Sequence, residues 1–343
     1  MEDKQQCHFE TGIYRPPSEG GSYSLLLRIT RNCPWNRCTF CMMYKEEKFS
    51  LRSPEELKQE IDSIASVCDQ LLETSHQLGF NGQINRQVAL DLLEKEPSLS
   101  ILPGYVMVVN WLISGAKTAF LQDANSITMK SEKLVDVLQY LRAKFPTLER
   151  VTSYARSKTI AKKEPDELKA IRTAGLERLH VGLETGDDEL LLEIKKGVTS
   201  EEQIIAGKKA MAAGFQLSEY WMPGLGGKAK SRQHAENTAR VLNEIDPNYI
   251  RSRPFFPAPG TPIQEDFAKG KFEMLSVGEQ LTELKIMMEK LDFTAKVCFD
   301  HDGNHWTDEN GQRIFSLDYE GYQFPDRKPT VLALIEKGLA GFN

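Results

Sequence analysis

The chain has 343 residues, enough to bury a large core as one barrel-type domain or as two ordinary domains. With 40% hydrophobic and 27% charged residues, its composition is that of a globular protein rather than a membrane-spanning or disordered one. The formal net charge of -6 argues against nucleic-acid binding, because contact with phosphates needs a basic face.

Short apolar segments alternate with amphipathic segments along most of the chain. The apolar segments predict strands at residues 24–29, 118–122, 150–155, 178–183, 216–222 and 248–256. Helix start signals lie between them: Ser53-Pro54-Glu55-Glu56 is a capping box with proline at the first helical position, and Ser131 opens another helix. Gly175 and Gly214 are expected helix ends. Six strands that alternate with helices predict an α/β fold with a parallel sheet.

Two stretches depart from this alternation. Residues 78–112 form an insertion after the first helix and are expected to be helical, and the apolar run 105–115 is too short to cross a bilayer. After Thr261 we expect a helix at 275–291 and then a polar, loop-rich tail. The sequence therefore predicts an N-terminal segment (1–23), a β/α domain (24–262) and a C-terminal extension of helices and loops (263–343).

Three of the six cysteines, Cys33, Cys38 and Cys41, lie in one short segment after the first predicted strand. Three thiolates on one loop can hold an iron–sulfur cluster and leave one iron without a protein ligand. Disulfides would need an oxidising compartment, but the first residues are charged and contain no apolar signal segment. We therefore expect a cytoplasmic protein with reduced thiols.

The remaining cysteines, Cys7, Cys68 and Cys298, are scattered along the chain. A structural zinc site would need a fourth ligand, for which His8 beside Cys7 is a candidate, so zinc stays an alternative to the cluster, as do reactive or merely buried thiols. Cys68 falls inside a helical pattern and is predicted to be a small apolar core residue.

The cysteine segment and the units after it resemble the radical S-adenosylmethionine (SAM) enzymes. The resemblance rests on the three cysteines, on Phe40 before the third of them and on the six β/α units, and it covers about residues 24–262. In this family three cysteines hold a [4Fe-4S] cluster whose open iron chelates SAM, and the reduced cluster cleaves SAM to methionine and a 5'-deoxyadenosyl radical. The resemblance implies a partial (β/α)6 barrel of the TIM type, with the site at the carboxyl ends of the strands.

Two features depart from the commonest pattern of this family. Four residues, rather than three, separate Cys33 from Cys38, and Asp123-Ala124-Asn125 stands where the family usually has Gly-Gly-Glu after the second strand. Asp123 or Asn125 could accept hydrogen bonds from the ammonium group of SAM. The alternative interpretation of this segment is an ordinary Asn/Asp turn.

Later segments resemble the coproporphyrinogen oxidase-like and methylthiotransferase-like branch of the family. Residues 181–189, followed by Lys195-Lys196-Gly197-Val198-Thr199, imply that Glu184 binds the ribose hydroxyls of SAM. In Ser153-Tyr154-Ala155-Arg156, at the end of the third strand, Arg156 is either a partner of the SAM carboxylate or a surface residue. The segment that holds Met222 and Gly224 resembles the one that lies against adenine.

The sequence offers four candidates for action on a substrate: Tyr44, Arg251, Arg253 and His301. The two-residue period of a strand places Arg251 and Arg253 on one face of the sixth strand, where they bind an anionic substrate or pair with a carboxylate such as Glu219. The segment 299–306, which contains His301, is either a solvated turn or a cap or metal site at the barrel mouth. Tyr44, three residues past Cys41, is expected to line the cysteine loop.

The sequence contains no second cysteine motif and no cobalamin-binding domain before the first strand, which disfavours sulfur insertion and cobalamin-dependent methyl transfer. We therefore expect an oxygen-sensitive enzyme that abstracts hydrogen from an unidentified small molecule, anionic if the arginines bind it. Reduced flavodoxin or ferredoxin is the expected electron donor, and neither a nucleic acid nor a membrane is an expected partner. The alternatives are a non-catalytic cluster or haem carrier on the same fold and a zinc-containing α/β protein.

Overall fold

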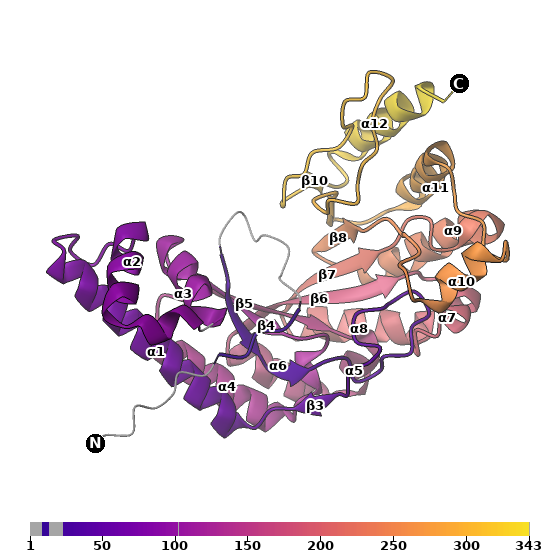
Figure 1. The fold of residues 1–343 in the computed structure, drawn as a ribbon. Coiled ribbons are helices and arrows are strands. Elements are labelled where there is room, and N and C mark those ends of the chain that lie inside the picture. The colour runs from indigo at the N-terminus through magenta and orange to yellow at the C-terminus, as the bar shows by residue number, and fades with distance from the viewer. Residues whose placement is uncertain (1–8, 14–22, 102, 343) are drawn as a thin grey trace. The chain divides into compact units, whose positions relative to one another are not determined.

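The computed structural model describes residues 9–13, 23–101 and 103–342 (Figure 1). The predictions for Cys7 and His8 therefore lie outside the described residues. The chain forms two compact units. The first contains Met1–Cys33, Lys48–Tyr154 and Lys169–Arg178, and the second contains Pro34–Glu47, Ala155–Leu168 and Leu179–Asn343.

The first unit holds three strands of the main sheet, a two-stranded ladder and most of the N-terminal helices. The strands are β1 (Leu25–Arg28), β4 (Thr118–Gln122) and β5 (Arg150–Ala155), and the ladder pairs β2 (Thr30–Arg31) with β3 (Ser50–Leu51). The helices are α1 (Pro54–Gln77), α2 (Arg86–Lys95), η1 (Pro97–Ile101), α3 (Pro103–Ile113), η2 (Ser126–Thr128) and α4 (Ser131–Lys144). Helix α6 (Pro165–Thr173) and strand β6 (Leu176–Glu184) each contain a boundary between the units, and so does β5, whose last residue belongs to the second unit.

The second unit holds the later strands and helices. Its strands after β6 are β7 (Gln216–Trp221), β8 (Tyr249–Ser252), β9 (Lys296–Cys298) and β10 (Tyr322–Gln323). Its helices are α5 (Ser157–Lys162), α7 (Asp188–Glu193), α8 (Ser200–Ala212), α9 (Gly227–Ile245), α10 (Pro262–Ala268), α11 (Val277–Lys290) and α12 (Lys328–Ala340). Helix α8 packs on α9, α9 on α11, and α11 on α12.

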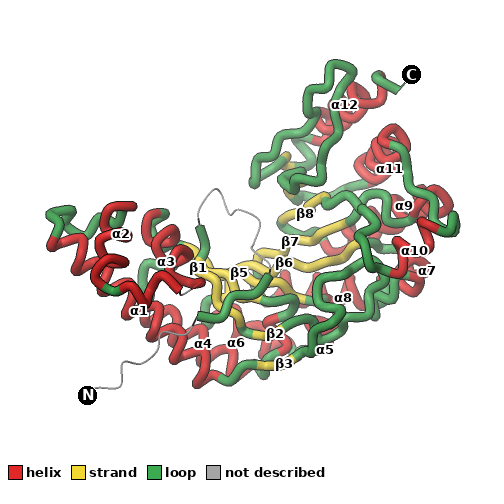
Figure 2. The backbone as a smooth tube through the Cα atoms, in the orientation of Figure 1, coloured by secondary structure: helices red, strands yellow, loops and turns green. Residues whose placement is uncertain are grey.

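The main sheet has eight strands in the hydrogen-bonding order β1-β4-β5-β6-β7-β8-β9-β10 (Figure 2). The pairs β1–β4, β4–β5, β7–β8 and β8–β9 are parallel, and β10 is antiparallel to β9. Each strand thus lies beside the strand that precedes it in this sheet along the chain, which is the order of β/α barrels. The predicted α/β fold class is confirmed.

The local signals in the sequence explain why these elements form where they do. Every residue of β4 is buried, as expected for a strand covered on both faces. The Ser53 hydroxyl accepts a hydrogen bond from Glu56 N and the Glu56 carboxylate accepts one from Ser53 N, so the predicted capping box at the start of α1 is confirmed. Gly175 and Gly214, the predicted helix ends, have φ of 111° and 85°, which glycine adopts without a steric penalty.

The predicted character of the insertion and of Cys68 is also confirmed. Residues 78–112 contain α2, η1 and most of α3. Cys68 lies in α1 with 7% of its surface exposed, and burial raises the pKa of its thiol to about 12. Among the described residues, no helix has the length and apolar character needed to cross a bilayer.

The prediction for the end of the chain was partly wrong. The tail after α11 contains β9, which extends the parallel sheet, and the 13-residue helix α12. A strand of only three residues is too short to show the alternation on which the prediction depends. The sixth predicted strand was too long, because β8 ends at Ser252, just before Pro254 and Pro257, which have no N–H to donate to a ladder.

We predict that Leu183→Ala in β6 lowers the free energy of unfolding by about 2–5 kcal/mol, because it leaves a cavity in a fully buried strand. The control is Leu192→Ala in α7, where the leucine is 79% exposed and the expected change is below about 0.5 kcal/mol. Urea denaturation of both variants measures the difference. Equal effects of the two substitutions would contradict the burial of β6.

Candidate cofactor site

The cysteine segment consists of three reduced, partly exposed thiols on irregular backbone. Cys33 follows β2 and belongs to the first unit, whereas Cys38 and Cys41 belong to the second. Thiolates are the ligands that iron–sulfur clusters take, and three of them leave one iron of a [4Fe-4S] cluster open. Within the described residues, no three His, Cys, Asp or Glu side chains are grouped so as to hold a single metal ion.

The turn at residues 194–197 holds the part of the cysteine segment that belongs to the second unit. The Thr39 N–H donates to the carbonyl of Ile194 (3.0 Å), and the indole N–H of Trp35 donates to the carbonyl of Lys195 (2.7 Å). Gly197 has φ of 73°, and a β-carbon there would lie 2.3 Å from the Trp35 ring. Only glycine therefore lets the tryptophan ring pack against this turn.

Cys38 lies in an environment with basic groups. Burial has the largest effect and raises the pKa of its thiol, as do Cys41 and Glu184, whereas the charges of Lys196 and Arg156 lower it. The two cations thus oppose the effect of burial on the thiolate form. The three thiols are donors of the kind that an iron–sulfur cluster takes.

Glu184 ends β6 in a strained conformation and points its carboxylate at a lysine. Its φ is 65°, in the left-handed region, which costs a non-glycine residue about 1–3 kcal/mol and is often found at functional sites. The carboxylate Oε1 lies 2.8 Å from Lys196 Nζ, and this ammonium lies 5.9 Å from the centre of the Phe40 ring. Gly182 leaves the necessary space, since a β-carbon there would lie 2.2 Å from Oε1 of Glu184.

The structure thus brings Cys38, Phe40 and Glu184 together around Lys196. Lys196 lies in the stretch 195–199, and the sequence predicted no role for it. Its only signal was its place shortly after residues 181–189, because Cys38 and Phe40 come from a distant part of the chain.

Arg156, Met222 and Gly224 lie in the same unit as this group. Arg156 Nη2 donates to the carbonyl of Lys196 (2.9 Å), and its guanidinium lies 5.1 Å from the Trp35 ring centre. Met222 N donates to the carbonyl of Glu184 (3.0 Å), and its side chain is buried in an apolar cluster against which Phe40 packs. Gly224 has φ of 83°. These contacts place Arg156 beside the turn that holds Lys196 and Met222 beside the end of β6. Contact of the three residues with SAM stays a prediction.

The residues predicted after β4 and β5 belong to the first unit. The Asp123 carboxylate is buried; its Oδ2 accepts hydrogen bonds from Arg28 Nε (2.8 Å) and Asn32 N (2.9 Å). Its Oδ1 has no hydrogen-bond partner among the described residues. The Asn125 side chain donates to Thr128, and the hydroxyl of Ser153 donates to the Leu121 carbonyl (3.1 Å). In the segment Asp123-Ala124-Asn125, the carboxylate of Asp123 is the acceptor that suits an ammonium group.

Arg251 and Arg253 do not share a strand face, so that prediction was wrong. Arg251 is in β8 and is 1% exposed, whereas Arg253 follows the end of the strand and is exposed. Arg251 pairs with Asp300 (2.8 Å), not with Glu219, and its guanidinium lies 4.0 Å from the Tyr319 ring centre. These contacts tie the C-terminal segment to the sheet.

His301 and Tyr44 also have local structural roles. His301 Nδ1 accepts a hydrogen bond from Gly303 N (2.9 Å) within a turn, and its side chain is exposed. Tyr44 is 2% exposed, and its carbonyl accepts hydrogen bonds from the side chain of Asn36 and from Glu47 N. Tyr44 therefore belongs to the cysteine loop, as expected. The solvated-turn interpretation of the 299–306 segment fits His301 and Asp302, which are exposed, but Phe299 and Trp306 are buried.

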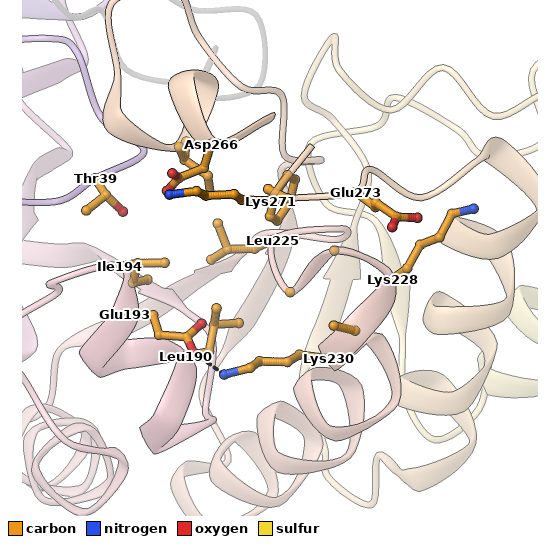
Figure 3. Close-up of a pocket in the computed structure, with 15 residues that line it drawn as sticks. Thr39, Leu190, Glu193, Ile194, Leu225, Lys228, Lys230, Asp266, Lys271 and Glu273 are labelled. Carbon is orange, nitrogen blue, oxygen red and sulfur yellow. Dashed lines mark hydrogen bonds and ion pairs between the residues drawn. The ribbon is translucent and has the colours of Figure 1, made fainter. Parts of the chain in front are cut away.

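A cavity of about 570 Å³ in the second unit includes Thr39 of the cysteine loop (Figure 3). Its floor is apolar and its rim carries three lysines and three acidic residues: Lys228, Lys230, Lys271, Glu193, Asp266 and Glu273. Lys230 pairs with Glu193, as the dashed line in Figure 3 marks. The volume suits a small ligand. None of the predicted cofactor residues lines this cavity, but its lining residues Leu190, Ile194 and Leu225 belong to the apolar cluster that contains Met222.

No family model matches the chain. In sequence it is similar to the 4'-phospho-dehydrooxetanocin synthase of Priestia megaterium, with 25% identity over 237 residues, which are 65% of this chain and 27% of that protein. The chain thus spans about a quarter of the length of this relative.

Solved structures of similar proteins include three enzymes. Methylornithine synthase has 15% identity and a TM-score of 0.48, covering 94% of this chain and 71% of that one. The radical SAM methyltransferase TsrM from Kitasatospora setae has 15% identity and a TM-score of 0.48, covering 77% and 43%. Coproporphyrinogen III oxidase from Escherichia coli, a radical SAM enzyme, has 14% identity and a TM-score of 0.46, covering 78% and 52%. Two of these three structures, TsrM and coproporphyrinogen III oxidase, are of radical SAM enzymes.

We predict that Arg251→Met lowers the free energy of unfolding by about 3–5 kcal/mol, because it leaves the Asp300 carboxylate buried without its partner. Arg253→Met is the control and should change the value by less than about 0.5 kcal/mol, since Arg253 is exposed. Chemical denaturation measures both. A stable Arg251→Met variant would contradict this structural role and would favour a role in substrate binding.

Proposed function

We propose that this chain is a radical SAM enzyme that abstracts hydrogen from a small-molecule substrate. Cys33, Cys38 and Cys41 would hold a [4Fe-4S] cluster with one open iron. When bound, the reduced cluster supplies the electron that cleaves SAM to methionine and a 5'-deoxyadenosyl radical. The observation that carries the proposal is the grouping of Cys38, Phe40 and Glu184 around Lys196 at the end of β6.

The second unit offers groups for the nucleoside part of SAM. Glu184 is an acceptor held in one orientation by its ion pair and by the left-handed backbone, which suits recognition of two ribose hydroxyls. Met222 and Gly224 follow β7 and would present a soft, flat surface to adenine. Arg156 would add a positive charge for the carboxylate of SAM.

The first unit offers one acceptor for the amino group of SAM. Oδ1 of Asp123 is buried without a hydrogen-bond partner among the described residues, a state that costs about 1–3 kcal/mol. An ammonium donor would remove this cost. Asp123 would thus accept a hydrogen bond from the amino group of SAM, the group that the family's Gly-Gly-Glu segment binds.

The substrate is proposed to be a small molecule. The curated relative is named for a phosphorylated product, which supports a phosphorylated substrate class for this chain. Reduced flavodoxin or ferredoxin is the proposed electron donor, and a cytoplasmic location is part of the proposal.

The test is anaerobic reconstitution with iron and sulfide, followed by dithionite and SAM. The wild-type protein should turn brown, bind about four iron atoms per chain and form 5'-deoxyadenosine. Cys38→Ala should lose both the colour and the product. Cys68→Ala is the matched control and should keep both, because Cys68 is buried in helix α1 and is not part of the cysteine segment.

Two outcomes would contradict the proposal. A wild-type protein that carries a full cluster and forms no 5'-deoxyadenosine with SAM is not a radical SAM enzyme. Tight haem binding in a titration would then favour the alternative function, a non-catalytic haem carrier on the same fold. Retained SAM cleavage by Cys38→Ala would remove Cys38 from the site.

A further inference from the structure

We propose that Lys196 is a positioning residue that holds a fixed positive charge between the cysteine loop and Glu184, where it raises the reduction potential of the cluster. This inference rests on the proposed function, because it concerns the cluster that the cysteines would hold. It follows from the backbone, the side-chain contacts and the charges around Lys196.

The backbone of Lys196 is fixed on both sides. Its N–H donates to the carbonyl of Leu191 (3.0 Å), and its carbonyl accepts a hydrogen bond from Arg156 (2.9 Å). The preceding carbonyl, of Lys195, accepts the indole N–H of Trp35, and the following residue is Gly197, against which the Trp35 ring packs. The cysteine segment and the lysine are therefore held by the same short turn.

The side chain of Lys196 lies in a mostly buried position. It is 12% exposed, and the Glu184 side chain with which it pairs at 2.8 Å is 13% exposed. Charge interactions are stronger in such an environment than in water, because little solvent screens them. Lys195, the adjacent lysine, is exposed. The backbone of Lys195 is left-handed, with φ of 51°, so the side chains of Lys195 and Lys196 leave the backbone in different directions.

The charge of Lys196 lies beside the cysteine loop. Its ammonium is 5.9 Å from the centre of the ring of Phe40, the residue that directly precedes Cys41. The preceding residue of the loop, Thr39, donates its N–H to the carbonyl of Ile194, two residues before Lys196 (3.0 Å). The lysine and the two cysteines of this unit are therefore held close together.

A positive field favours the reduced form of a cluster, since reduction adds one negative charge. Net charge near a cluster is one of the factors that set its potential. Removal of Lys196 should thus make the cluster harder to reduce, and removal of the Glu184 charge should make it easier to reduce. This opposite pair of effects separates an electrostatic role from a merely structural one.

The experiment is a redox titration of the reconstituted cluster, followed by electron paramagnetic resonance in the absence of SAM. In Lys196→Met the ratio of reduced to oxidised cluster at a fixed potential should fall about tenfold, which corresponds to 59 mV for a one-electron couple. Lys196→Arg should restore the wild-type potential because it keeps the charge. Lys195→Met is the matched control and should leave the potential unchanged, since solvent screens the exposed neighbour.

Glu184→Gln supplies the independent measurement, and its potential should rise. A Lys196→Met protein with full iron content and the wild-type potential overturns the inference. If Lys196→Met does not retain its cluster, Glu184→Gln decides: a potential that does not rise overturns the inference as well. Failure of the proposed function would differ, because the wild-type protein itself would then lack a cluster or SAM cleavage.

Discussion

The candidate site depends on one backbone feature, the turn at residues 194–197, whose three successive carbonyls each accept a hydrogen bond. The donors are Thr39 N, the Trp35 indole and the Arg156 guanidinium. Irregular loops satisfy few of their own backbone groups, so the cysteine segment needs external partners to keep one conformation. The turn supplies these partners and, through Lys196, also places a charge beside Cys38. Structure and electrostatics of the loop are therefore set by the same four residues.

The second unit contains two buried ion pairs in different structural settings. Arg251 and Asp300 form an ion pair beside a tyrosine ring, and the C-terminal segment packs on it. Lys196 and Glu184 form an ion pair at a strand end, where the carboxylate stands on strained backbone. A buried pair contributes little net stability but is costly to break, so both pairs fix geometry more than they add stability. The first fixes an extension of the fold, and the second fixes two groups of the proposed site.

The fold was predictable where the signal was local. The strand predicted at 118–122 coincides with β4, because all of its residues are buried, and the capping box at Ser53 marks the start of α1. The cysteines and Glu184 could be singled out because a family motif surrounds them. The role proposed for Lys196 could not be predicted, because the sequence shows two adjacent lysines. Which of them lies beside Phe40 and Glu184 depends on the left-handed backbone of Lys195. The prediction that Arg251 and Arg253 share a strand face was wrong, because β8 ends at Ser252, shortly before Pro254.

The replacement of Gly-Gly-Glu by Asp123-Ala124-Asn125 has a physical explanation in the first unit. A short carboxylate directly after β4 can be held by two donors, and Arg28 and Asn32 supply them to the same oxygen. The other oxygen has no hydrogen-bond partner among the described residues and lies against Gly12, where a β-carbon would be 1.9 Å away. Protein contacts thus fix the orientation of the Asp123 carboxylate, which would lower the entropic cost of the contact proposed for it. Asn125 donates to Thr128 and supports the turn that follows. Contacts within the first unit therefore hold both polar side chains of this segment, and the proposed contact of Asp123 needs no Gly-Gly-Glu sequence.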